Sequence, residues 1–227
     1  MPRIRWAALA LGVAGILFVL YPAIRPFSDE ASLRGAAAFA STSWILAHML
    51  AMLGFILLMV GLLGLYLVLS DTRTKRLAFA ALVSGLIAIG LTLPFYGGEA
   101  FGLHAIGQRA VEQHSSALMS LAPVVRSGPQ LVMFLIGLLI LGVASILAAI
   151  AIWKSGSLAK WSGIPFSAGF ALYIPQFFGS QPIRVVHGIL VMGGCLWIAV
   201  EMWRAGRGGT KAPISSWAVK RHLPKRR

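Results

Sequence analysis

The sequence predicts an all-α protein, a polytopic membrane bundle with six transmembrane helices. Hydrophobic residues make up 58% of the 227 residues and charged residues only 11%, whereas about 25% of the residues in an ordinary soluble domain are charged. The apolar runs are continuous, which favours helices over barrel strands, whose hydrophobicity alternates. Because a helix rises ~1.5 Å per residue, about 20 residues cross the ~30 Å hydrocarbon core. The predicted spans are 4–24, 44–70, 77–95, 130–153, 161–178 and 183–203.

The first predicted span, 4–24, follows a basic start and resembles a secretory signal peptide. Its apolar run is longer than a usual signal-peptide core, and the nearest small-residue cleavage site, at 36–41, lies far beyond its end. We therefore expect it to be retained as a helix. Loops 71–76 and 154–160 are short, so consecutive spans should be antiparallel neighbours within one domain, 1–203.

The net charge of +14 is spread unevenly, which predicts the orientation in the lipid bilayer. With the N-terminus in the cytoplasm, only five of the 20 lysines and arginines lie on the outer side, which leaves 15 on the inner side. The positive-inside rule therefore places both termini in the cytoplasm, in a bacterial-type inner membrane. We expect the basic cytoplasmic tail, 204–227, to contact anionic lipid headgroups rather than nucleic acid. The outer five are Arg25, Arg34, Arg109, Arg126 and Arg184.

The three helices that run outward end in a similar way. The sequence is YP at 21–22, LPFYG at 93–97 and IPQFFG at 174–179, and a histidine follows the second and third of these ends. One interpretation is that the chain consists of three related helical hairpins. The other is that proline and aromatic residues favour membrane interfaces.

The long outer segment after the third span contains an amphipathic stretch, about 100–126. Its apolar residues recur near helical spacing and polar residues fill the other positions, which predicts a helix that lies on the outer surface or caps the bundle. The two glycines at 97–98 permit a sharp turn before Glu99. Glu99 and His104 would meet only if this stretch is not one regular helix.

Polar residues in the predicted outer leaflet are the main indication of chemistry. An ionisable group in or near hydrocarbon costs about 2.5 kcal/mol or more, so such groups are candidates for function. Glu99 and His104 are the candidate catalytic groups, and His48, His104 and His187 are the candidate metal ligands. An aromatic cavity with a few convergent polar groups is typical of a small-ligand site. The candidate ligand-binding residues are Trp44, Phe95, Tyr96, Phe101, Tyr173, Gln176, Phe177 and Arg184.

The same residues also have structural interpretations. His48 and His187 can bond carbonyls or each other and so hold two helices together. Arg184 can extend to the outer headgroups. Glu99 can form an ion pair with Arg184 or Arg109.

The leading functional hypothesis is a metal- or haem-centred site that binds a small ligand or processes a lipid. Three histidines and a carboxylate suit zinc with one position left for water, with Glu99 as the general base. Alternatively, His48 and His187 would ligate one b-type haem. Cys195 is the only cysteine, so the chain has no CxxCH haem attachment and no intrachain disulfide.

Three other hypotheses stand beside it. The first is a metal-free acid–base enzyme that acts on an isoprenoid or quinone-like lipid, with Glu99 as the proton donor and aromatic rings that stabilise a cation. The second is a small-molecule transporter, favoured by the glycine content and the prolines at helix ends. The third is a structural or sensing membrane protein without chemistry.

Overall fold

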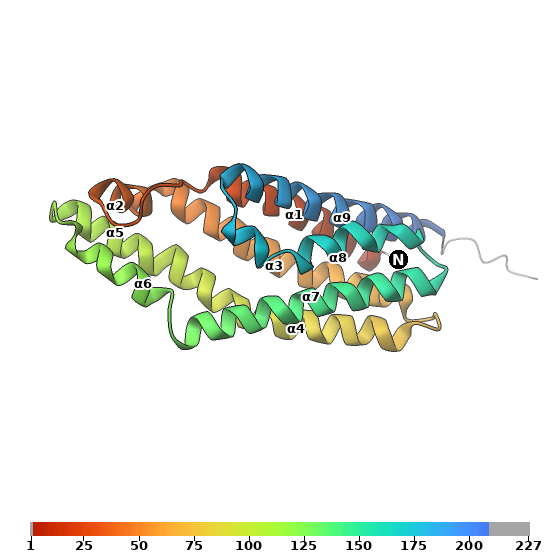
Figure 1. Ribbon diagram of the computed structural model, residues 1–227. Helices are drawn as coiled ribbons and strands as arrows, with labels where there is room; N and C mark the ends of the chain where they lie inside the picture. Colours follow the sequence, from red (N-terminus) through yellow and green to blue (C-terminus); the bar gives the residue numbers. More distant parts are fainter. Residues whose placement is uncertain (1, 209–227) are drawn as a thin grey trace, which may run out of the picture.

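Every regular element in residues 2–208, the part of the chain that the computed structural model describes, is helical. The elements form an elongated bundle (Figure 1). The α-helices are α1 (Pro2–Ile24), α2 (Leu33–Ala40), α3 (Thr42–Leu69), α4 (Lys75–Gly97), α5 (Leu103–Glu112), α6 (Ala122–Val125), α7 (Pro129–Ser155), α8 (Gly163–Ala171) and α9 (Gln181–Gly208). Four short elements complete the fold: the π turn η1 (Gly98–Gly102) and the 3-10 turns η2 (Ser116–Leu121), η3 (Lys160–Ser162) and η4 (Pro175–Phe178). The all-α prediction is confirmed for these residues, and most of the predicted tail, 209–227, lies outside them.

Within residues 2–208, five helices are long and apolar enough to cross a membrane. They are α1, α3, α4 with its continuation to Glu112, α7 and α9. They account for five of the six predicted spans. The remaining predicted span, 161–178, is not one long helix, because α8 has only nine residues and is followed by a turn and then η4. Pro175 explains the break, since its ring excludes a hydrogen bond and clashes with the carbonyl four residues earlier, that of Ala171.

Consecutive long elements pack as antiparallel pairs with glycines at the closest points. Between α1 and α3, a Cβ on Gly61 would lie 2.8 Å from the Cβ of Leu11, and between α4 and α7 a Cβ on Gly137 would lie 2.6 Å from Thr92 Oγ1. Small residues at such contacts are typical of helices that associate in lipid. The segment from Ala159 to η4 also runs antiparallel to α9 along most of its length. Its contacts with α9 join Ala159 to Glu201, Phe166 to Gly194 and Gly169 to Val191.

The end of the bundle opposite the N-terminus, which we call the distal end, carries α2, η1, α5, η2 and α6 (Figure 1). Helix α4 passes through η1 directly into α5, so the glycines at 97–98 do not turn the chain. Both adopt right-handed helical backbone angles. Helix α5 buries Leu103, Gly107 and Ala110 against α2 and the other distal elements. A small apolar core separate from that of the bundle results, formed by Ala36, Phe39, Trp44, Leu103, Ala110, Met119 and Ala122.

Two adjacent glycines of α9 provide a matched test of this packing. A Cβ on Gly194 would collide with the backbone of α8, including Phe166 N and, at 2.5 Å, Phe166 Cα, whereas a Cβ on Gly193 would meet nothing within 4 Å. We expect Gly194→Ala to destabilise the protein by about 1–3 kcal/mol because the α8–α9 contact must open. Gly193→Ala should leave the stability unchanged or slightly raised. Thermal unfolding of both purified variants in detergent checks this, and equal midpoints would contradict the described packing.

Candidate functional site

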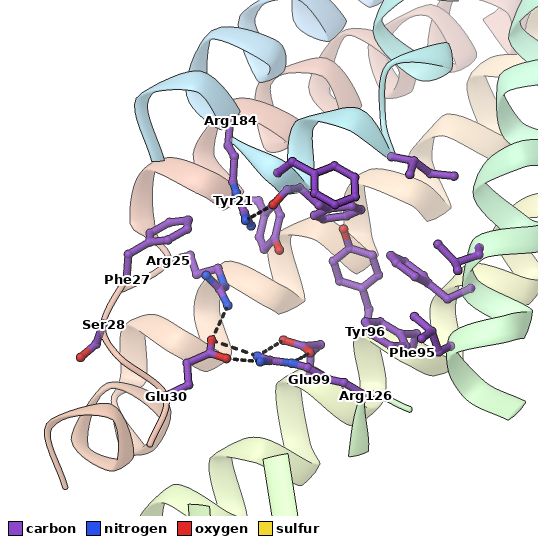
Figure 2. Close-up of a pocket in the computed structure, with 16 residues that line it drawn as sticks. Tyr21, Arg25, Phe27, Ser28, Glu30, Phe95, Tyr96, Glu99, Arg126 and Arg184 are labelled. Atoms are coloured by element: carbon purple, nitrogen blue, oxygen red, sulfur yellow. Dashed lines mark hydrogen bonds and ion pairs between the residues drawn. The ribbon is translucent and has the colours of Figure 1, made fainter. Parts of the chain in front are cut away.

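A cavity of about 410 Å³ opens at the distal end, between the end of α1, α4, η1, α7, η4 and the start of α9 (Figure 2). One wall is polar and the other is apolar and largely aromatic. The polar wall consists of Tyr21, Arg25, Ser28, Glu30, Tyr96, Glu99, Arg126 and Arg184. The apolar wall, called the aromatic wall below, consists of Phe95, Leu131, Phe134, Leu135, Ile174, Phe177 and Phe178. The remaining lining residue, Phe27, lies on the polar side beside Arg25.

Arg126 joins two carboxylates at the polar wall. Its guanidinium donates through Nε and Nη2 to the two oxygens of Glu99, with Nη2 3.1 Å from Oε2. It also donates through Nη1 and Nη2 to Glu30, with Nη2 3.2 Å from Oε1. Burial lowers the pKa of Arg126, but the hydrogen bonds and charges of Glu99 and Glu30 raise it more, so this pKa lies above its ordinary value. Arg126 therefore ties the α1–α2 connection and η1 to the end of α6 as a permanent cation.

Glu99, a residue of η1, is buried against Trp44 and His48 of α3 and the Arg126 guanidinium. The residue is only 7% exposed, and the indole N–H of Trp44 donates to its backbone oxygen over 2.7 Å. The structural interpretation of Glu99 in the sequence was an ion pair with Arg184 or Arg109. Neither pair forms, because Arg109 lies on the exposed face of α5 and pairs with Glu112 at 3.0 Å, whereas Arg184 donates to backbone carbonyls.

His48 is fully buried beside Glu99. Its Nδ1 lies 2.7 Å from the backbone oxygen of Trp44 and must donate to that oxygen. Its Nε2 lies 3.5 Å from Glu99 Oε2 and has no hydrogen-bond partner within residues 2–208. The rings of Trp44 and Tyr21 pack on the imidazole, with centroids 4.5 and 5.4 Å away. His48 thus contacts the carboxylate at the polar wall rather than His187.

The other two candidate metal ligands connect helices elsewhere. His104 Nδ1 lies 2.8 Å from Phe39 O and links α5 to α2, whereas His187 Nε2 lies 2.7 Å from Gly169 O and links α9 to α8. No group of three histidine, cysteine or acidic side chains within residues 2–208 is close enough to hold a metal ion. The structure therefore does not assemble the predicted three-histidine zinc site. Each of the three imidazoles instead donates an N–H to a nearby main-chain oxygen.

The candidate ligand-binding residues separate into two groups. Phe95, Tyr96, Phe177 and Arg184 line the cavity. Trp44 and Tyr173 are buried behind it, where Tyr173 Oη lies 3.3 Å from Tyr96 Oη. Gln176 borders a separate small void next to His187, and Phe101 is 56% exposed outside the cavity. His104, the second candidate catalytic group, does not line the cavity either.

Sequence reasoning missed the two cations and one anion that complete the polar wall: Arg25, Arg126 and Glu30. The sequence analysis placed Arg25 and Arg126 on the outer side of the membrane and gave them no role in the site. One signal was available, because a buried Glu99 requires a cation and only five were predicted on that side. The choice among those five depends on the fold of 113–128, which carries no strong pattern.

Comparison of the chain with protein-family models, curated proteins and solved structures finds no match.

The Arg126 bridge makes a stability prediction. In Arg126→Gln the carboxylates of Glu99 and Glu30 lose their shared cation, and we expect the free energy of unfolding to fall by about 3 kcal/mol. Arg109→Gln is the control, since the exposed Arg109–Glu112 pair should contribute less than about 0.5 kcal/mol. Thermal or denaturant unfolding measures both. The double variant Arg126→Gln/Glu99→Gln should cost less than the sum of the single changes, and strict additivity would contradict the coupling.

Proposed function

We propose that this protein is a membrane protein that binds a small amphipathic ligand, a lipid or lipid-like molecule, in the distal cavity. The observation that carries the proposal is that one cavity has a polar wall with charged groups and an aromatic wall. Pockets for small ligands commonly have volumes of about 300–1,000 Å³ and combine apolar walls with a few placed polar groups. A cavity of about 410 Å³ with both kinds of wall fits that description.

The aromatic wall extends to the outside of the bundle, which supports entry from the lipid. Phe95 and Phe134 stack with their ring centroids 4.1 Å apart inside the cavity. Phe178 is 90% exposed and Leu135 is 36% exposed, so two residues of the wall also face outward. A chain in the surrounding lipid can therefore reach the aromatic wall without passing through the core.

We further propose six membrane crossings, with both termini in the cytoplasm and the cavity in the outer leaflet of a bacterial-type inner membrane. Two observations support this topology. The interrupted segment from Ala159 to η4 follows α9 from Glu201 back toward the start of α9, so it passes the same depth as a long helix. The positive-inside rule supplies the second, because nine lysines and arginines of residues 2–208 lie toward the end that carries the N-terminus and five toward the distal end.

The geometry ranks the other hypotheses. A carboxylate that accepts two N–H bonds from one guanidinium is typically ionised, so the Arg126 bridge weighs against Glu99 as a proton donor. Zinc and haem have less support, because no three histidine, cysteine or acidic side chains of residues 2–208 lie close enough to hold a metal ion, and His48 and His187 contact different groups. A transporter is the second candidate, since α8 is interrupted beside the cavity and discontinuous helices often form transport sites. Substrate accumulation in proteoliposomes would distinguish a transporter from a binding protein.

The proposed topology is testable through the single cysteine. In a Cys195→Ala background, Ser116→Cys places an exposed thiol at the distal end and Ser157→Cys places one at the opposite end. We expect a membrane-impermeant maleimide applied to intact cells to label the first and not the second. Labelling of both after the membrane is permeabilised is the control. The reverse pattern would overturn the proposed orientation.

The binding proposal is tested by photo-crosslinking of full-length protein in neutral-lipid nanodiscs. The probes are a photoactivatable fatty acid and the matching fatty alcohol. We expect at least one probe to label residues of the aromatic wall preferentially. Leu135→Trp should fill the mouth of the cavity and reduce this labelling at least fivefold. Leu139→Trp, one turn along α7, is 62% exposed and does not line the cavity, so it should have little effect. Labelling spread over all lipid-facing residues would reject the proposal.

A further inference from the structure

The polar wall contains two arginines whose charges are not fully balanced, Arg25 and Arg184. Arg25 is nearly buried, with its side chain 10% exposed, and makes one ion pair, Nη2 to Glu30 Oε1 at 3.3 Å. Its Nε is buried without a hydrogen-bond partner in the described part of the chain. The guanidinium lies over two rings, 4.5 Å from the centroid of Trp44 and 4.7 Å from that of Phe27. A buried N–H of a charged group without a partner is costly and indicates an absent acceptor.

Arg184 approaches the same place from the first turn of α9. It donates to the backbone oxygens of Gly179, over 3.0 Å, and Phe177, over 2.6 Å. Within residues 2–208 it forms no ion pair with a carboxylate; the pairs found there involve other cations. Its guanidinium carbon lies 5.2 Å from the centroid of Phe27, the ring that Arg25 also contacts. Figure 2 shows Arg25 beside Phe27 and the side chain of Arg184 extending toward Tyr21.

The charge balance of the cavity is therefore positive. Three arginines and two glutamates line it, and both glutamates already bind Arg126. Two guanidinium groups that meet at one phenylalanine ring repel each other, and this repulsion is strong where water is scarce. A bound anion would relieve this repulsion. Arginine suits carboxylate and phosphate oxygens because its N–H groups form a planar fork.

We infer that the ligand is a single-chain amphiphile with an oxyanion head group, a carboxylate or a phosphate, held between Arg25 and Arg184. Its chain lies along Phe95, Phe134 and Phe177. This inference rests on the proposed function and specifies its ligand class. The formal excess of one positive charge among the lining residues matches a singly charged head, and the modest volume favours one chain rather than two.

The test is competition against the photoactivatable fatty acid, with full-length protein in neutral-lipid nanodiscs. Dodecanoate and dodecyl phosphate should compete at concentrations at least tenfold lower than dodecanol. Acetate and inorganic phosphate should not compete, because they lack the chain; if they compete as well as the long-chain anions, the site binds free anions and the inference of an amphiphile is wrong. Equal competition by dodecanol and dodecanoate would overturn the inference of an anionic head. This wild-type comparison decides the head-group preference without any variant.

Two variants locate the head group. Arg25→Gln and Arg184→Gln should each reduce the preference for dodecanoate over dodecanol to about threefold or less, while dodecanol binding is retained. Retained dodecanol binding shows that the cavity has folded. Arg34→Gln removes an exposed charge on α2 at the same end and should keep the full preference. If a glutamine variant also loses dodecanol binding, the lysine variant at the same position is used in its place. Lysine keeps the positive charge but lacks the planar set of N–H donors.

The outcomes separate this inference from the proposed function. If both probes label the aromatic wall and Leu135→Trp blocks them, but the head group makes no difference, then the cavity binds amphiphiles and only the inference fails. An unchanged preference in both glutamine variants would place the anion elsewhere and also overturn the inference. If neither probe labels the wall, the proposed function itself fails.

Discussion

The neutralisation of two carboxylates by Arg126 is the interaction on which the distal end depends. Glu99 comes from the π turn after α4, Glu30 from the α1–α2 connection and Arg126 from the end of α6, so one guanidinium joins three segments that are distant in sequence. The buried carboxylate of Glu99 would be costly without its cation, whereas the Glu30 side chain is 37% exposed and also pairs with Arg25. Because Arg126 binds both acidic groups, little negative charge is left for Arg25 and none for Arg184. The same interaction therefore stabilises the fold and gives the cavity its positive character.

The break between α8 and η4 connects the architecture of the bundle to the cavity. Glycines allow α8 to pack closely on α9, and Pro175 then ends the helical path before the distal end. The main-chain oxygens of the turn that follows become acceptors for Arg184. Phe177 lies in that turn and lines the cavity. An uninterrupted helix would bond those oxygens internally and leave the guanidinium without them.

Hydrophobic length was sufficient to predict the helical class and five long helices, because bilayer thickness fixes that length. It could not locate the break after Ala171, although Pro175 four residues later was a local signal. Glycines at 97–98 permitted a turn, but nothing local required one. For His48 and His187 the sequence allowed either a metal ligand or a bond to a main-chain carbonyl, and the structure shows the carbonyl bond for both. His104, also a candidate metal ligand, bonds the main-chain oxygen of Phe39. The pairing of Glu99 with Arg126 was beyond sequence reasoning, since it depends on how a weakly patterned segment folds back on η1.

The position of Trp44 has one further consequence. Its indole lies beneath the Arg25 guanidinium and bonds the main chain of Glu99, and it is the only tryptophan of residues 2–208 at the distal end. The other described tryptophans, at 6, 153, 161, 197 and 203, belong to the parts of α1, α7, η3 and α9 that lie toward the N-terminal end of the bundle. A cation over an indole polarises its excited state, so any displacement of Arg25 alters the light that Trp44 emits. The fluorescence of Trp44 therefore reports on changes at the polar wall of the cavity.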